Sequence, residues 1–328
     1  MLSRQVIVYA KCLKNHLSRL SRFGLEGTFF EIEGNETNKS IESYLKIIDF
    51  LIEKDFKKSD LLVAVGGGSV LDLVGFVAAT FMRGVEVAFV PTTLLAMVDA
   101  SIGGKNGINR PWVKNILGTT YLPKQTFLDM YFLSLMSPEE LYPGYVEMIK
   151  VAVIDAFCSI DQTEERLKRQ YSGSFLEDWE FPPSEKSIER ARALKQGIVG
   201  EDIQEKGLRK LLNFGHTVGH ALEAYLDFTM SHGEAVQHGM SVEMELLEFP
   251  LVLRQKIASY FPYKTPFPAI HRENFLKILL RDKKNAENKI ALSNVLMHKH
   301  KEYIAYFDAE KVVNACLKRA HDSLYPGA

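Results

Sequence analysis

The sequence predicts the α/β fold class, and three observations predict it. In the first third of the chain, short apolar runs alternate with amphipathic segments, a pattern typical of a parallel sheet covered by helices. A glycine-rich turn, Gly66–Ser69, directly follows the apolar run Leu61–Val65. After Met136, helical patterns predominate to the end of the chain. We therefore expect an N-terminal Rossmann-like parallel-sheet domain followed by a mainly α-helical domain.

The N-terminal elements follow from the spacing of apolar residues. Runs of strand length and segments with apolar residues three or four positions apart take turns along the chain. The expected strands are Val6–Tyr9, Thr28–Glu33, Leu61–Val65 and Val85–Val90, and the expected helices are Leu13–Phe23 and Ser40–Lys54.

The C-terminal half begins with a helix start. Ser137 can cap the helix, Pro138 suits its first position, and two acidic residues follow in the first turn. Glu189–Ile203 and Gly215–Tyr225 are further expected helices. The change in pattern predicts a nucleotide-binding α/β domain at residues 1–136 and a mainly helical domain at residues 137–328. We expect the active site in the cleft between them.

Composition excludes several classes of partner. The 328 residues include 40 basic and 41 acidic side chains, and this balance argues against nucleic acid or an anionic membrane as partner. The apolar stretch at 85–98 is shorter than the about 20 residues that a membrane span needs. Cys12, Cys158 and Cys316 are widely scattered, which fits a reducing compartment. We expect a soluble, cytoplasmic protein.

The glycine turn Gly66–Ser69 lies between a strand and a helix. Glycine lets a ligand approach the backbone, and the helix N-terminus supplies N–H groups and a positive dipole for a phosphate. The alternative is a tight strand–helix turn without a ligand. Asp72, in the first helical turn, is either a capping acid or a ligand for a ribose hydroxyl.

A polar run follows the fourth expected strand. Asp, Lys, Asn and Gly residues are dense over Asp99–Asn109, and Lys114 and Asn115 come shortly after. Lysines near a glycine pair suit a phosphorylated or carboxylated ligand. The alternative interpretation is a solvated connector.

The helical half holds a candidate metal and proton-transfer cluster. His216 and His220 are four residues apart and share one helix face. His232 follows, and Glu147 lies on an earlier helix, three residues before Lys150. One Glu with two or three His would complete a catalytic zinc site. Spacing alone leaves open which two of the three histidines bind the metal.

Taken together, these motifs resemble the 3-dehydroquinate synthases, a family of sugar phosphate cyclases. The resemblance covers about residues 30–290 and rests on the order and spacing of all the motifs. They are GGG at 66–68 with Asp72, Arg83, PTTLL at 91–95, VDASIGGKNGIN at 98–109, KN at 114–115, EMIK at 147–150, GLRKLLNFGHTVGHALE at 207–223 and HGEAV at 232–236.

The resemblance implies a role for each member of the cluster. Glu147, His216 and His232 would bind a divalent metal, Zn²⁺ or Co²⁺. His220 would then be free for proton transfer, with Glu205 as its acid–base companion.

The resemblance also implies two binding sets. The residues that would bind NAD are Glu36, Lys39, Gly67, Gly68, Ser69, Asp72, Thr92, Thr93 and Lys114. Those that would contact the phosphorylated keto-acid substrate are Arg83, Asp99, Lys105, Asn115, Lys150, Lys195, Arg209, Asn213 and one of Lys283 and Lys284. Lys150 also counts as catalytic, and Arg83 would act across a homodimer interface. Two positions depart from the family: Ala10 stands where an Asp contacts the nucleotide, and Leu135 where many relatives carry Thr.

The implied reaction belongs to the shikimate pathway of aromatic amino acid biosynthesis. It converts 3-deoxy-arabino-heptulosonate 7-phosphate into 3-dehydroquinate and phosphate, with transient oxidation by NAD, phosphate elimination, reduction and aldol closure. The alternatives are a sugar phosphate cyclase whose substrate lacks the carboxylate, a metal-dependent polyol or glycerol dehydrogenase, and a catalytically silent homologue.

Overall fold

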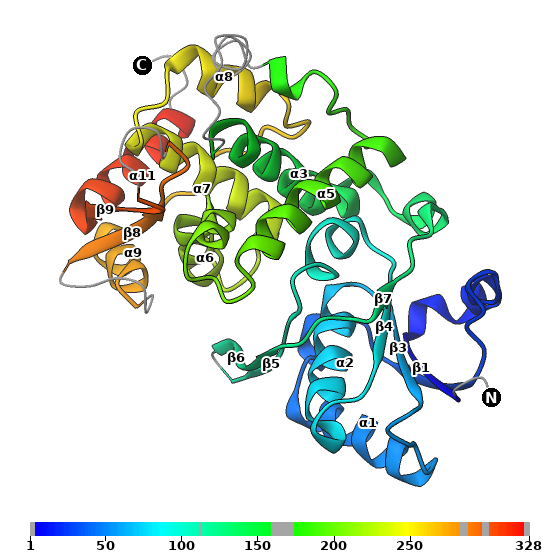
Figure 1. Cartoon of the computed structure of the whole chain (residues 1–328). Helices are drawn as coiled ribbons and strands as arrows, with labels where there is room; N and C mark the ends of the chain where they lie inside the picture. Colours follow the sequence, from blue (N-terminus) through cyan, green and yellow to red (C-terminus); the bar gives the residue numbers. More distant parts are fainter. Residues whose placement is uncertain (1–3, 112, 159–173, 282–287, 297–301, 325–328) are drawn as a thin grey trace. The chain divides into compact units, whose positions relative to one another are not determined.

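The computed structural model describes residues 4–111, 113–158, 174–281, 288–296 and 302–324 (Figure 1). The chain divides into two compact units, Met1–Gly144 (unit 1) and Tyr145–Ala328 (unit 2). The helix α3 (Pro138–Cys158) begins in unit 1 and continues into unit 2. The functional division expected at residues 136 and 137 stays a prediction.

Unit 1 is built on a five-stranded parallel sheet, as the sequence predicts (Figure 1). Its central strands are buried and apolar, the pattern of strands that are covered on both faces. In spatial order the strands are β2 (Thr28–Ile32), β1 (Gln5–Ala10), β3 (Leu61–Gly66), β4 (Val87–Pro91) and β7 (Gln125–Thr126).

Two α-helices of unit 1 pack against the sheet and against each other. Ser40 caps α1 (Ile41–Glu53) by accepting a hydrogen bond from the backbone N–H of Ser43, and the helix buries Ile47 and Leu51. The helix α2 (Gly68–Thr80) starts directly at the glycine turn after β3. The other helical segments are η1 (Lys11–Phe23), η2 (Glu36–Asn38), η3 (Phe81–Arg83), η4 (Ala96–Ala100) and η5 (Met130–Leu135).

The polar run of unit 1 forms an antiparallel hairpin that the sequence did not predict. Its strands are β5 (Lys105–Arg110) and β6 (Val113–Thr120). The strand β5 packs on α2 so closely that a Cβ atom at Gly75 would lie 2.0 Å from Oδ1 of Asn106. Most of β6 is exposed. The hairpin therefore lacks the alternating apolar pattern by which sequence reasoning detects a strand.

Unit 2 is mainly helical, as predicted. Besides α3, the helices among the described residues of this unit are η6 (Ser174–Leu176), α5 (Glu185–Glu201), η7 (Leu208–Asn213), α6 (His216–Tyr225), α7 (His232–Leu246), α8 (Leu251–Ser259), α9 (Arg272–Leu279) and α11 (Ala309–Leu324). One antiparallel hairpin, β8 (Lys289–Ser293) with β9 (Ile304–Asp308), was missed. A core that includes Val218, Phe275 and Val312 joins this hairpin to α6, α7, α9 and α11.

Among the helices that the structure describes, none combines the length and the apolar character needed to cross a membrane.

Candidate metal centre and nucleotide-binding site

Close backbone contact between α6 and α7 sets the geometry of the candidate metal centre. A Cβ atom at Gly239 would lie 1.8 Å from the carbonyl oxygen of Gly215, and one at Gly219 would lie 2.9 Å from that of Ala235. Gly215 has φ +77°, a left-handed conformation that favours glycine. Glycine at these positions lets the two helices meet without intervening side chains.

His216 and His232 each occupy the first position of a helix, α6 and α7 respectively. Before His232, Ser231 forms a reciprocal capping box with Glu234, whose carboxylate accepts hydrogen bonds from the N–H and hydroxyl of Ser231. The cap fixes the backbone from which His232 projects.

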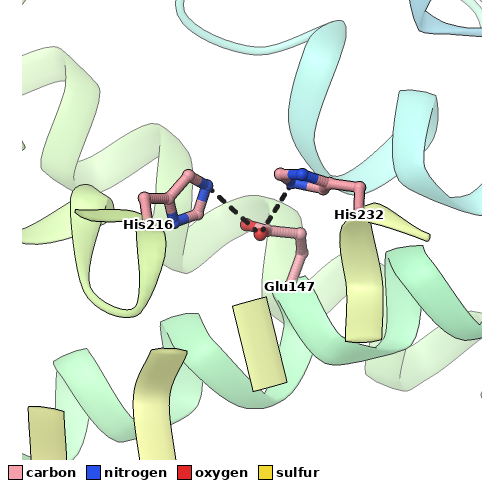
Figure 2. A group of neighbouring side chains, drawn as sticks. All are labelled: Glu147, His216 and His232. Atoms are coloured by element: carbon pink, nitrogen blue, oxygen red, sulfur yellow. Dashed lines mark ion pairs between the residues drawn. The ribbon is translucent and has the colours of Figure 1, made fainter. Parts of the chain in front are cut away.

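Glu147, on α3, lies between the two imidazoles (Figure 2). Its Oε1 atom is 3.6 Å from Nε2 of His216 and 3.7 Å from Nε2 of His232. One ligand atom from each of the three residues lies within 4.8 Å of the other two. Glu147 is thus brought together with two histidines that lie 69 and 85 positions further along the chain.

The group fits a divalent metal ion. Oε1 of Glu147 is buried and has no hydrogen-bond partner among the described residues, although two imidazole nitrogens face it. A tetrahedral Zn²⁺ with ligand bonds of about 2.0–2.2 Å separates its ligand atoms by roughly 3.3–3.6 Å. The observed separations are close to that range, and three protein ligands leave a coordination position for substrate or water.

Charges around the group favour the ligating forms of two of its members. Burial alone would raise the pKa of Glu147, but the Lys150 ammonium, which forms an ion pair with it, and the charges of His232 and Lys195 hold this pKa well below its usual range. Burial, together with the positive charge of Lys150, lowers the pKa of His216, so its imidazole is neutral.

His232 responds differently because two carboxylates flank it. Burial lowers its pKa, but Glu147 and Glu223 outweigh burial and raise the pKa to about 9. A proton and a metal ion therefore compete for this imidazole.

His220 is exposed and lies beside the group, with its ring centroid 5.2 Å from that of His216. It also belongs to a second set of three neighbouring ligand atoms, with Glu223 and His232. The structure thus places His216 and His232, but not His220, in the set with Glu147.

Four other predicted residues of unit 2 lie on α5 and on the segment that leads to α6. Lys195 of α5 is buried, and its positive charge helps to lower the pKa of Glu147. Arg209 is buried and donates a hydrogen bond from Nη1 to the Ile203 carbonyl. Nδ2 of Asn213 donates to Oε1 of Glu205 at 2.6 Å. Lys283 and Lys284 lie outside the described residues.

In unit 1, four of the predicted NAD-binding residues form one polar network with Asn109 and Asn115 of the hairpin β5–β6. Lys39 is buried and contacts the carboxylate of Asp72 and the amide oxygen of Asn115. The Glu36 carboxylate accepts hydrogen bonds from the hydroxyl of Ser69 at 2.6 Å and from Nδ2 of Asn109 at 2.7 Å. Burial raises the pKa of Asp72 to about 6, against the opposing effect of Lys39.

The glycine turn lies against the end of β4. The backbone N–H of Thr92 donates to the Gly66 carbonyl, and a Cβ atom at Gly67 would lie 3.3 Å from Cγ2 of Thr93. A Cβ at Gly68 would meet the Ala100 side chain at 3.4 Å. These residues line the carboxyl edge of the parallel strands, where α/β sheets bind ligands.

The remaining predicted residues of unit 1 are more dispersed. Lys105 and Lys114 are exposed on the hairpin β5–β6, and Asp99 lies on η4. Arg83 is exposed, has φ +61°, and follows the C-terminal end of α2. A helix of 13 residues is about 20 Å long, so Arg83 lies roughly that far from the glycine turn.

Sequence reasoning gave no role to two residues of these networks, Glu223 and Asn109. Glu223 is seven residues, or about two turns, after His216, and so shares its helix face. That spacing is a signal that could have found it. Asn109 contacts Glu36 only because the hairpin β5–β6 forms, so no local pattern in the sequence could have predicted this contact.

The parallel sheet with its glycine turn, joined to a helical unit, is the fold of the sugar phosphate cyclases. The structure superposes on 2-epi-5-epi-valiolone synthase from Streptomyces hygroscopicus subsp. jinggangensis 5008, which was solved with NAD⁺ and Zn²⁺ bound, with a TM-score of 0.74 and 22% sequence identity. The match covers 97% of this chain and 91% of that one.

Within the sugar phosphate cyclases, comparison of sequences identifies one family. Family models described as 3-dehydroquinate synthase N-terminal and C-terminal match residues 29–142 and 144–285. The 3-dehydroquinate synthase of Latilactobacillus sakei subsp. sakei (strain 23K) is 36% identical, with 81% of this chain and 74% of the relative covered. That of Corynebacterium diphtheriae (strain ATCC 700971 / NCTC 13129 / Biotype gravis) is 37% identical, with 83% and 76% covered. The chain belongs to the 3-dehydroquinate synthase family.

Proposed function

We propose that the chain converts 3-deoxy-arabino-heptulosonate 7-phosphate into 3-dehydroquinate and phosphate, with NAD and one divalent metal ion. The observation that carries the proposal is the group of Glu147, His216 and His232 in a chain of this family. The reaction is a carbon–oxygen lyase step coupled to ring closure. Hydride leaves the substrate and later returns to it, so NAD is not consumed.

Glu147, His216 and His232 are assigned to the metal ion. When bound, Zn²⁺ or Co²⁺ supplies Lewis acidity to a substrate oxygen on which negative charge develops. Lys150 keeps Glu147 ionised through the ion pair between them, and burial keeps His216 neutral. Both ligands are therefore held in the protonation state that binds a cation.

His220 is assigned to proton transfer. It is exposed and lies beside the metal group, and an imidazole can accept and donate protons near neutral pH. Glu205 is assigned as its acid–base companion, and the hydrogen bond from Asn213 orients the Glu205 carboxylate. Lys150 is assigned to catalysis as a cation at the metal group.

The substrate carries a carboxylate and a phosphate, and cationic side chains are assigned to both. The guanidinium of Arg209 offers a planar fork that suits a carboxylate, and Lys195 adds a buried positive charge. The full proposed substrate set is Arg83, Asp99, Lys105, Asn115, Lys150, Lys195, Arg209, Asn213 and one of Lys283 and Lys284.

NAD is assigned to the polar network of unit 1. The glycine turn and the N-terminus of α2 suit the pyrophosphate, and acidic side chains such as Glu36 and Asp72 suit ribose hydroxyls. The network joins three segments, which supports one binding site. The proposed set is Glu36, Lys39, Gly67, Gly68, Ser69, Asp72, Thr92, Thr93 and Lys114.

We also propose a cytoplasmic homodimer in which Arg83 reaches the substrate phosphate bound by the partner. The exposed position of Arg83, at the end of α2 remote from the glycine turn, supports this assignment.

A second candidate is another sugar phosphate cyclase, because the fold is shared with 2-epi-5-epi-valiolone synthase. A substrate without a carboxylate would leave Arg209 and Lys195 without the anion that their charges suit. We therefore prefer the heptulosonate over a sugar phosphate without a carboxylate, such as sedoheptulose 7-phosphate.

A phosphate-release assay tests the proposal. The purified chain is given each sugar phosphate in turn, with and without NAD, a metal chelator and added Zn²⁺. We expect release from the heptulosonate phosphate only, with loss on chelation and recovery with Zn²⁺. Release from sedoheptulose 7-phosphate alone would support the second candidate, and no release from either would support a silent homologue.

A further inference from the structure

The carboxylate of Glu223 contacts the side of His232 that faces away from Glu147. Glu223 lies on α6, and its side chain is 9% exposed. Its Oε1 atom is 3.5 Å from Nδ1 of His232, whereas Nε2 of the same ring is 3.7 Å from Oε1 of Glu147. One imidazole thus lies between two carboxylates, with one ring nitrogen directed to each.

We propose that Glu223 is a positioning residue for the metal site: it accepts a hydrogen bond from Nδ1–H of His232 and so presents the Nε2 lone pair to the metal ion. The inference rests on the metal assignment above and extends it to a residue outside the ligand set.

The chemistry of a neutral imidazole supports this role. Such a ring carries one N–H, and the acceptor that holds it decides which nitrogen keeps a lone pair for the metal. With the proton on Nδ1, Nε2 can coordinate an ion next to Glu147. With the proton on Nε2, the N–H would point at the metal position and block it.

The helix cap fixes the backbone of His232. The orientation of the imidazole then depends only on the side-chain torsion angles. The capping box of Ser231 and Glu234 holds the first turn of α7. The carboxylate of Glu223 comes from the neighbouring helix α6, which meets α7 at glycine backbones. The distance between α6 and α7 therefore decides where the Glu223 carboxylate lies and how the His232 ring is oriented.

His216 shows the same arrangement with a different acceptor. Its Nδ1 atom lies 3.2 Å from the backbone carbonyl oxygen of Phe214, and its Nε2 faces Glu147. Both histidines of the metal group therefore have Nδ1 beside an acceptor and Nε2 toward the metal position. Only the acceptor of His232 is a side chain, which makes it accessible to mutagenesis.

The test compares Glu223→Met, which keeps the side-chain length but removes the acceptor, with Glu223→Gln, which keeps an acceptor oxygen and removes the charge. Zn²⁺ affinity of each apoprotein is measured by competition with a chromophoric chelator. We expect Glu223→Met to bind Zn²⁺ about 10–100-fold more weakly than the wild type, the range typical for loss of such a partner. Glu223→Gln should stay within about threefold.

The matched control is Glu245→Gln. Glu245 is a partly buried carboxylate of α7 that pairs with Arg254 and Arg319. Glu245→Gln removes a charge and ion pairs from unit 2, but it leaves in place the hydrogen-bond acceptor that faces Nδ1 of His232. We expect unchanged Zn²⁺ affinity. Equal weakening in the Met and Gln variants, or wild-type affinity in the folded Met variant, would overturn the positioning role.

A spectroscopic measurement keeps the inference testable if the Met variant does not fold. Imidazole ¹⁵N NMR of the Zn²⁺-loaded wild type should show His232 protonated at Nδ1 and coordinated at Nε2. Coordination through Nδ1 would contradict the inference. A wild type that binds no Zn²⁺ at all would instead refute the metal assignment itself, so the two failures are distinguishable.

Discussion

At the residue scale, the proposed metal site depends most directly on His216, the first residue of α6. His216 is a neutral, largely buried imidazole whose Nε2 faces the Glu147 carboxylate. Its neighbours in the ligand set come from two other helices, α3 and α7. The group that could hold a metal ion therefore takes one ligand atom from each of three helices.

The variant His216→Ala should lose metal binding and turnover together. Removal of a ligand should weaken Zn²⁺ binding by more than the roughly 10–100-fold typical for loss of an outer partner. Metal content after dialysis and phosphate release are the measurements. His271→Ala, which removes an exposed imidazole outside the group, serves as the control and should retain both. Stoichiometric Zn²⁺ with a near-normal rate in His216→Ala would refute the ligand assignment.

At the element scale, the contact between α6 and α7 brings the metal group together. The helices approach at glycines, and the closest contact is between Gly239 and the carbonyl of Gly215. The atom that a Cβ would meet there belongs to the backbone, so a rotamer change cannot relieve the overlap.

The variant Gly239→Ala should destabilise unit 2 and weaken Zn²⁺ binding, because α6 and α7 must separate to accept the methyl group. We expect a loss in the range of about 1–3 kcal/mol that overpacking usually causes. Denaturant unfolding and chelator competition measure the two effects.

The control is Gly197→Ala on α5, where the added Cβ has no heavy atom of the described residues within 4 Å, apart from its own stretch of helix backbone. Helix propensity alone should stabilise that variant by about 0.5–1 kcal/mol. If the two glycine variants had the same free energy of unfolding and the same Zn²⁺ affinity, the close approach of α6 and α7 would not contribute to stability or to metal binding.

A second contact between elements joins η1 to the segment before η5. Asp129 is buried and accepts hydrogen bonds from Arg19 and Arg22 of η1 and from the Tyr131 N–H. Burial alone would raise the pKa of this carboxyl, but Arg19 and the other donors hold it below its usual range. The folded state therefore binds this proton less tightly than the unfolded state does.

The variant Asp129→Asn should destabilise the protein near neutral pH by about 1.5–3 kcal/mol, the range for hydrogen bonds to a charged group. Because the folded pKa is depressed, the stabilisation is fully present above the unfolded pKa of about 3.9 and is lost as the pH falls through the folded pKa. Urea unfolding of both proteins should show the gap shrink below about pH 4. Asp49→Asn, at an exposed site on α1, should change stability by less than about 0.5 kcal/mol. A gap that does not change with pH would exclude the ionised carboxylate as its source.

At the scale of the whole molecule, local patterns predicted the first four strands of the parallel sheet and the helices α1, α2, α3, α5 and α6. The apolar run before Gly66 and the cap at Ser40 carry their own signals, and β3 and α1 form there. The hairpins β5–β6 and β8–β9 were missed because pairing between chain segments, not alternation within them, defines those strands. The helix expected over Glu189–Ile203 forms as α5, but it begins four residues earlier, at Glu185 after the cap Ser184.

The candidate site depends on contacts between distant segments, which spacing cannot show. The helix period places His216 and His220 on one face, but it does not tell which of them meets Glu147. The resemblance to the family selected His216 and His232, and the structure groups these two with Glu147. The partner Glu223 follows only from the packing of α6 against α7.

The most direct test of the account records phosphate and reduced nicotinamide in one reaction, with enzyme, Zn²⁺, a little NAD and excess 3-deoxy-arabino-heptulosonate 7-phosphate. We expect phosphate to accumulate far beyond the amount of NAD, 3-dehydroquinate to form in an amount equal to the phosphate, and no net NADH to appear. NADH that rises in step with substrate consumption would contradict it and indicate a dehydrogenase.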